Sequence, residues 1–238
     1  AENILTAEKI ETIKAETKSY IETELSIAYN ARPLIPDTDE EMNDVYAPAP
    51  STERTGKEPH GGSEKRFIDG IKEGLHQSMT KHSNLILMGQ DIAEYGGAFK
   101  ITEGFVQEFG KERVRNTPLC ESAIVGTALG LSLEGYKAMM EMQFADFVTV
   151  GFNQIVNNLA KIHYRWGQNA DVVIRMPTGG GVGAGPFHSQ SNEAWFAHTP
   201  GLKVVYPSTP ADAKGLLIAA INDPNPVMFF EHKALYRS

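Results

Sequence analysis

The sequence has little cysteine, no long apolar run and no excess of positive charge. Cys120 is its only cysteine, so it can form neither an intrachain disulfide nor a cysteine metal cluster, which fits a reducing compartment. No apolar run approaches the length of about 20 residues that spans a bilayer, and the first residues lack a signal-peptide pattern. The net charge of −8 argues against nucleic acid or an anionic membrane as the main partner. These features predict a cytoplasmic protein.

The composition divides the chain into three segments. In residues 1–30, apolar side chains recur at helical spacing among Lys and Glu, which predicts an amphipathic helix over 7–29. Residues 31–63 carry five prolines among acidic and small polar residues and are predicted to be a linker, pinned at Val45–Tyr46. Residues 64–238 form the third segment, a globular domain.

Short apolar runs alternate with helical patterns through the third segment. This alternation predicts an α/β fold in which helices cover both faces of a mostly parallel sheet. Ligands bind beyond the carboxyl ends of the strands in such sheets, so polar residues that follow strands are candidate site residues. The predicted strands are 84–88, 113–115, 137–141, 171–176, 202–206 and 226–231, and the predicted helices are 64–80, 103–109, 123–133, 146–163, 192–198 and 210–221.

Three polar clusters follow predicted strands. Glu121 stands between a strand and a helix start, where backbone N–H groups stabilise a carboxylate. Gln143 and Phe147 are four residues apart at the predicted start of helix 146–163, so an amide and an aromatic ring would share roughly one face if the helix begins early enough. His188 follows a glycine-rich run, and its imidazole suits proton transfer near neutral pH. Each residue also has an ordinary structural interpretation, as a helix-start carboxylate, core filler or a loop histidine.

Several motifs occur in the order shown by one enzyme family. The runs are Gly89–Ala93 (GQDIA), Gly96–Lys100 (GGAFK), Asn116–Ser122 (NTPLCES), Glu141–Phe147 (EMQFADF), Phe187–Ser191 (FHSQS) and Pro200–Pro207 (PGLKVVYP). With these motifs, residues 64–238 resemble the beta subunit of the thiamine-diphosphate-dependent 2-oxo acid dehydrogenases. The resemblance implies a transketolase-like pyrimidine-binding domain.

The resemblance also implies roles for individual residues. Glu121 matches the glutamate that activates thiamine diphosphate by hydrogen-bonding its aminopyrimidine ring. Leu119, Gln143 and Phe147 match residues that line the pyrimidine pocket, and His188 matches the histidine that faces the substrate and the incoming lipoyl group. The Gly-Asp-Gly motif that holds the diphosphate and magnesium is missing. An alpha-type diphosphate-binding domain or subunit is therefore the expected partner.

Two further features concern ions and charge near the cofactor. Gln90 stands where many relatives carry Glu, so an amide replaces a second carboxylate. The resemblance also suggests a potassium site built from main-chain carbonyls, which leave almost no side-chain signature. The matching positions are Ala170, Val172, Val173, Ala220, Asp223 and Asn225.

The helix in segment 1–30, together with Asp44–Ala47, resembles the carboxyl-terminal tail of the alpha subunit of the same enzymes. The chain would then correspond to the junction of a fused alpha–beta polypeptide, working in a dimeric or heterotetramer-like assembly. We predict oxidative decarboxylation of a branched-chain 2-oxo acid (2-oxoisovalerate), with acyl transfer to the lipoyl domain of an acyltransferase. The alternatives are a pyruvate dehydrogenase beta subunit and a non-catalytic assembly module.

Overall fold

The computed structural model describes residues 5–49 and 63–238, in two compact units, Ala1–Glu41 and Met42–Ser238. The first unit contains helix α1 (Ala7–Asn30), which begins at Thr6, whose hydroxyl accepts a hydrogen bond from the amide of Lys9. No residue of α1 is buried, so its apolar stripe is exposed. In the described part of the chain, no helix combines the length and apolar character needed to cross a membrane.

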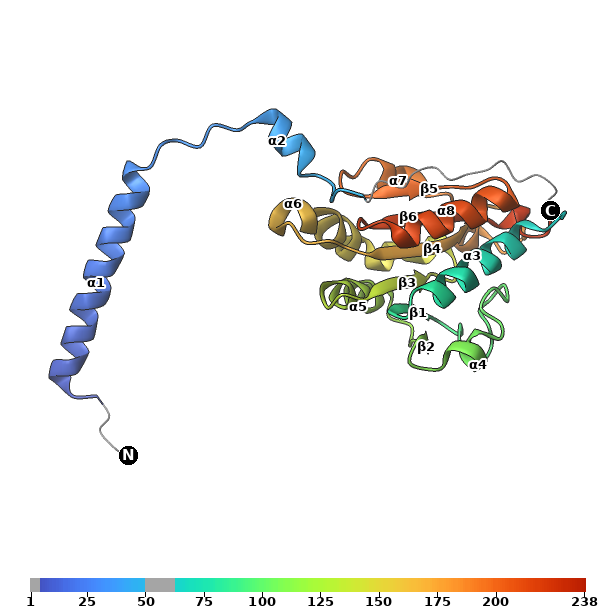
Figure 1. Cartoon of the computed structure of the whole chain (residues 1–238), viewed down its shortest axis with the longest axis horizontal. Helices are drawn as coiled ribbons and strands as arrows, with labels where there is room; N and C mark the ends of the chain where they lie inside the picture. Colours follow the sequence, from blue (N-terminus) through green and yellow to red (C-terminus); the bar gives the residue numbers. More distant parts are fainter. Residues whose placement is uncertain (1–4, 50–62) are drawn as a thin grey trace. The chain divides into compact units, whose positions relative to one another are not determined.

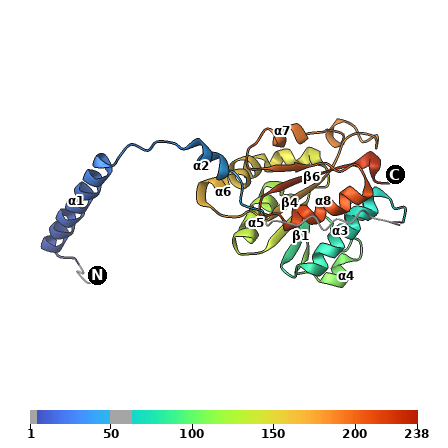
Figure 2. The same ribbon diagram turned by 45° about the horizontal axis from the view of Figure 1, so that its top comes forward.

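The second unit is built around a six-stranded sheet in the order β2-β1-β3-β4-β6-β5 (Figures 1 and 2). All five strand pairings are parallel, so the carboxyl ends of the strands lie along one edge. This confirms the predicted fold class. The strands are β1 (Leu85–Gly89), β2 (Val114–Asn116), β3 (Lys137–Glu141), β4 (Val172–Thr178), β5 (Lys203–Val205) and β6 (Val227–His232).

Helices cover both faces of the sheet because strand residues alternate between two apolar cores. One core joins Leu87, Met139 and Phe229 to helices α3 and α8, which lie side by side (Figure 2). The other joins Met140 and Ile174 to α5 and to the irregular segment after β3. The α-helices that follow residue 63 are α3 (Phe67–Lys81), α4 (Phe105–Phe109), α5 (Glu121–Leu133), α6 (Ile162–Trp166), α7 (Glu193–Ala197) and α8 (Pro210–Asn222).

The prediction of one continuous α-helix over 146–163 is wrong, because the segment is helical but irregular. The segment consists of the 3₁₀ helix η1 (Ala145–Gly151), the π-helical turn η2 (Gln154–Asn158), the 3₁₀ turn η3 (Leu159–Lys161) and α6. The run Val148–Gly151 contains β-branched residues and a glycine, which disfavour an α-helix. Gly151 also packs closely on Val125 of α5, where an added Cβ would lie 3.1 Å from a valine methyl group.

The predicted linker contains more structure than expected. A short helix, α2 (Thr38–Asn43), begins after Asp37, whose carboxylate accepts from the amides of Asp39 and Glu40. Ala47 exchanges two hydrogen bonds with the side chain of Asn225, at 2.7 and 2.9 Å. The hydroxyl of Tyr46 donates to the carbonyl of Leu202 at 3.2 Å. The chain is therefore fastened to the second unit at Tyr46–Ala47. Residues 50–62 of the predicted linker lie outside the described part of the chain.

Candidate functional site

The carboxyl-terminal edge of the sheet carries the candidate site. Glu121 is the first residue of α5, which follows β2, and it is half-buried. The side-chain amide of Gln90, which follows β1, donates to a carboxylate oxygen of Glu121 at 3.2 Å. Gln90 is only 6 % exposed, and within the described residues its own amide oxygen has no hydrogen-bond partner. A carboxylate and an unsatisfied buried acceptor therefore stand side by side.

A second group of predicted residues meets through ring contacts. The imidazole of His188 lies edge-on to Phe144 and Phe147, with ring centroids 4.7 and 5.5 Å apart. Phe144 also contacts Phe147 and Phe99. The half-buried imidazole therefore packs against two aromatic rings.

The other two predicted pocket residues are placed differently. Leu119 is 80 % exposed, so no part of this domain covers it. Gln143 is half-buried but lies outside η1, because that helix begins at Ala145 after an extended Phe144. Gln143 and Phe147 would share a helical face only if the helix began early enough, and this condition is not met, although both residues follow β3.

The glycine-rich run forms a closed loop between β4 and α7. Its base is fixed by the carbonyl of Gln190, which accepts from the amide of Gly179 at 2.9 Å and from the hydroxyl of Thr178 at 3.1 Å. Asp146 is buried and accepts from the amides of Ser189 and Gln190 at 3.2 and 3.1 Å. His188 is thus carried by a loop that is tied to both β4 and η1.

A buried ionic network lies beneath this edge, and it was not predicted. The guanidinium of Arg175 on β4 pairs with Glu141 on β3 and, at 2.5 Å, with Glu231 on β6. The hydroxyl of Tyr236 donates to the second oxygen of Glu231 at 2.6 Å. The available signal was an Arg or a Glu in each of three largely apolar strand runs.

Burial and charge perturb the pKa values in this network. Burial raises the pKa of the Glu231 carboxyl, although Arg175 opposes this shift. Burial also acts to lower the pKa of Arg175, but Glu231 and Glu141 outweigh it and raise that pKa. The pKa of the Tyr236 phenol is raised, first by burial and then by Glu231. Arg175 is therefore a fixed positive charge between two buried acids.

The residues present fit the aminopyrimidine end of the cofactor that the resemblance implies. Glu121 supplies a carboxyl group, Gln90 a buried oxygen without a donor, and Phe147 a half-buried ring. An aminopyrimidine needs these same chemical partners: a carboxyl for its ring nitrogen, an acceptor for its amino group and a face for stacking. Among the described residues, no cluster of His, Cys, Asp and Glu is arranged to hold a metal ion.

The predicted potassium-site residues lie at the opposite edge of the sheet, around the start of β4 and the end of α8 with the turn that follows it. The amide of Ala170 donates to the carbonyl of Pro224 at 2.9 Å. The carbonyls of Ala170 and Ala220 already accept from the amides of Val172 and Asp223. The carboxylate of Asp223 is occupied by Lys203 and Asn225. The donor set therefore fits a cation only in part.

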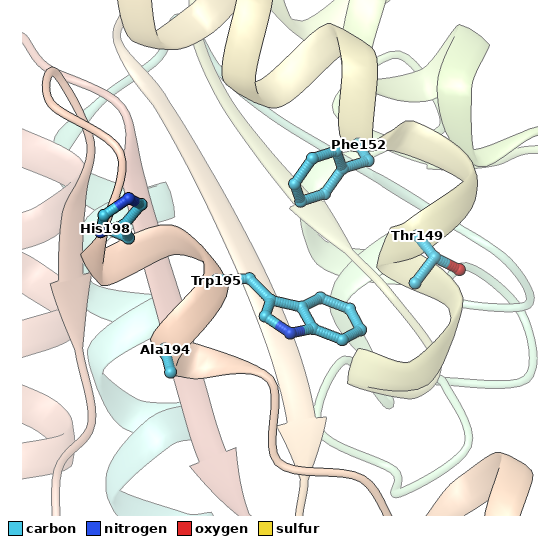
Figure 3. Close-up of a pocket in the computed structure, with 5 residues that line it drawn as sticks. All are labelled: Thr149, Phe152, Ala194, Trp195 and His198. Carbon is cyan, nitrogen blue, oxygen red and sulfur yellow. The ribbon is translucent and has the colours of Figure 1, made fainter.

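A separate apolar cavity of about 660 Å³ lies between η1 and α7 (Figure 3). The rings of Phe152 and Trp195 face it from opposite sides, with centroids 6.4 Å apart. Thr149, Ala194 and His198 complete the lining. None of the predicted site residues lines this cavity, so it is distinct from the edge that carries Glu121 and His188.

Comparisons with known proteins place this geometry in context. The family model for the transketolase pyrimidine-binding domain matches residues 64–238. A solved structure described as "Split gene transketolase, inactive beta4 tetramer" matches with a TM-score of 0.56 and 20 % identity, covering 70 % of this chain and 50 % of that one. At this identity the match shows the fold alone.

Curated relatives are more similar in sequence. The chain is 49 % identical over 173 residues to 2-oxoisovalerate dehydrogenase subunit beta of Bacillus subtilis (strain 168), covering 72 % of this chain and 53 % of that protein. Identity is 47 % to the mitochondrial 2-oxoisovalerate dehydrogenase subunit beta of Dictyostelium discoideum, covering 72 % and 47 %. It is 46 % to pyruvate dehydrogenase E1 component subunit beta of Bacillus subtilis (strain 168), covering 72 % and 54 %. The chain spans about half the length of these relatives.

Proposed function

Because residues 64–238 belong to the transketolase pyrimidine-binding domain family, we propose that this chain supplies the pyrimidine-binding half of a thiamine-diphosphate-dependent 2-oxo acid dehydrogenase. The observation that carries the proposal is the hydrogen bond between buried Gln90 and half-buried Glu121 at the carboxyl ends of the strands. It provides a carboxyl group on a rigid helix start, where family relatives need one.

Each site residue has a role in this proposal. When bound, thiamine diphosphate supplies the carbon nucleophile for decarboxylation of a 2-oxo acid. Glu121 holds a proton at its carboxyl group for the ring nitrogen of the pyrimidine. Phe147, Gln143 and Leu119 orient the ring. His188 moves a proton during acyl transfer to a lipoyl group.

The diphosphate and magnesium sites are absent from this sequence, so the proposal includes an alpha-type diphosphate-binding partner. The 80 % exposure of Leu119 supports this, because a pocket residue needs a second surface to enclose it. We assign helix α1 to an alpha-subunit-like tail, and its exposed apolar stripe suits an assembly contact. The same stripe favours the alternative, a non-catalytic assembly module. The cytoplasmic location stays a prediction.

For the substrate, we propose a branched-chain 2-oxo acid, with pyruvate as the alternative. The runs 143–146 and 188–191 look closer to branched-chain members, and the geometry joins these two runs through Asp146. Relatives of both types have similar identity to the chain. A comparison of kcat/KM for 2-oxoisovalerate and pyruvate in the reconstituted enzyme decides between them.

The proposal is tested by calorimetric titration with thiamine diphosphate and magnesium, with and without an added diphosphate-binding subunit. Binding in the reconstituted complex alone, lost on Glu121→Ala, is the expected result. Glu121→Gln should then abolish cofactor-dependent decarboxylation while the complex still forms. No binding in a verified, folded complex would favour the assembly module instead.

A further inference from the structure

Asp146 ties the histidine loop to η1 through two hydrogen bonds to one oxygen. Its Oδ1 accepts from the backbone amides of Ser189 and Gln190, the two residues directly after His188. A third bond strengthens this connection, because the side-chain amide of Asn192 donates to the carbonyl of Ala145 at 3.1 Å. The returning limb of the loop is thus anchored to the first turn of η1.

The same turn of η1 also forms the wall on which the imidazole rests. Phe144 and Phe147 flank Asp146 in sequence, and both rings contact His188. The position of the imidazole therefore depends on two things: the aromatic wall and the grip of Asp146 on the next two amides. If the hydrogen bonds from Asp146 are weakened, Phe144 and Phe147 keep their places, but the loop that carries His188 is free to move.

Lys233, which follows β6, places a buried positive charge behind this turn. The side chain belongs to a residue that is only 4 % exposed, and its Nζ lies 5.4 Å from the ring centroid of Phe144. Within the described residues, Lys233 Nζ and Asp146 Oδ2 are both buried without a hydrogen-bond partner. Burial lowers the pKa of Lys233, and the charge of Asp146 acts in the opposite direction.

A lysine with a purely structural role would reach solvent or pair directly with an acceptor, because a buried unpaired ammonium is costly. Lys233 does neither. Its position instead places a positive charge beside the ring of Phe144, two residues from Asp146, and this charge attracts the buried carboxylate. A charged carboxylate accepts hydrogen bonds from two amides more strongly than a neutral acceptor does.

We propose that Asp146 and Lys233 are positioning residues for His188: Asp146 clamps the loop, and Lys233 supplies a positive charge that attracts the carboxylate of this clamp. The importance of His188 for acyl transfer rests on the proposed function, whereas the clamp itself does not. Neither residue touches the reacting atoms in this scheme, and both act through the backbone of Ser189 and Gln190.

The test is hydrogen–deuterium exchange of the Ser189 and Gln190 amides by NMR, measured on the 238-residue chain. The amides of β4 serve as the internal reference for global stability. Lys233→Met and Asp146→Asn are each expected to speed exchange of the two loop amides by roughly tenfold or more, the effect of losing a charge-assisted hydrogen bond. Lys233→Arg keeps the charge and should retain protection.

Lys137→Met is the matched control, since it removes a largely buried lysine paired with Asp171 at the other end of β3. It should leave the loop amides unchanged. Lys233→Met should add nothing in an Asp146→Asn background. Unchanged loop exchange in Lys233→Met, or additive effects in the double variant, overturns the role of Lys233. If neither Lys233→Met nor Lys233→Gln folds, Lys233 is a stability residue and the proposal fails as well.

This exchange measurement needs neither cofactor nor substrate, so it stands even if the dehydrogenase proposal fails. In the reconstituted enzyme, Lys233→Met should slow acyl transfer to a lipoyl domain while the Kd for thiamine diphosphate stays the same. A changed Kd with unchanged loop exchange would assign Lys233 to cofactor binding and contradict the positioning role.

Discussion

The side-chain amide of Gln90 donates a hydrogen bond to the carboxylate of Glu121 over 3.2 Å. This contact links the end of β1 to the first residue of α5, across the loop that follows β2. Glu121 is therefore oriented by a neutral donor. By the family resemblance, an acid would be expected at the position of Gln90. The amide constrains the carboxylate without adding a second negative charge.

Replacing Gln90 tests this relationship directly. In the reconstituted enzyme, Gln90→Leu should lower kcat about tenfold, since one hydrogen bond of roughly 1 kcal/mol or slightly more is lost. Gln90→Glu should shift the alkaline limb of the pH–rate profile to higher pH, because a neighbouring carboxylate makes ionisation of the Glu121 carboxyl group harder. Gln107→Leu, on the exposed face of α4, is the control. Equal profiles for all variants would show that Gln90 does not orient Glu121.

The Arg175 network should dominate the stability of the sheet. Arg175→Met leaves Glu141 and Glu231 buried without a cation, and breaking a buried pair in this way costs roughly 3–5 kcal/mol. Urea unfolding measures the loss. A triple variant that also carries Glu141→Gln and Glu231→Gln should recover most of it, because no unpaired charge remains. A loss below about 1 kcal/mol for the single variant would contradict this account.

Two glycines of the loop form a matched pair for steric analysis. Gly179 and Gly183 both have positive φ values, +82° and +69°, so alanine is strained at either position by about 1 kcal/mol or more. At Gly179 an added Cβ would also lie 2.6 Å from the imidazole of His232, whereas nothing lies within 4 Å at Gly183. Gly179→Ala should therefore destabilise the chain clearly more than Gly183→Ala in urea unfolding. Equal losses would mean that His232 moves aside freely.

His82 should make the domain sensitive to mild acid. Burial lowers the pKa of this imidazole below its usual 6.5, with Lys137 and Lys81 acting in the same direction. The unfolded chain then binds a proton more readily, so stability is present above about pH 6.5 and is lost as pH falls through the lowered folded value. NMR titration should place the midpoint of His82 below 6.5, and His82→Gln should flatten the decline of unfolding free energy. A midpoint at or above 6.5 would refute this.

The strand pattern made the sheet predictable. Strands of a parallel sheet are buried on both faces, so they appear in the sequence as continuous apolar runs such as Val172–Ile174. The helix start at Glu121 was also predictable to within two residues. The segment after β3 was not, since its 3₁₀ and π turns depend on close packing between Gly151 and α5, which helical periodicity does not encode. The start of this segment was predicted to within one residue, at Asp146 against the observed Ala145.

The contacts that tie the site together depended on strand order. Arg175 meets Glu141 and Glu231 because β4 lies between β3 and β6, and a sequence that shows six strands does not show their order. The link between Asp146 and the loop after His188 spans more than forty residues, as does the approach of Lys233 to Phe144. Local patterns predict which residue types follow each strand, but contacts between distant segments appear only in the folded chain.

The double hydrogen bond between Ala47 and Asn225 gives the preceding chain a fixed point of origin. Residues 31–44, which join α1 to Ala47, are exposed throughout. A tethered helix samples a limited volume, and for any surface within that volume its effective concentration reaches roughly the millimolar range. A weak affinity of the apolar stripe of α1 for such a surface would then suffice for binding. The distance that α1 can reach would depend on the anchor at Asn225 as well as on the length of residues 31–44.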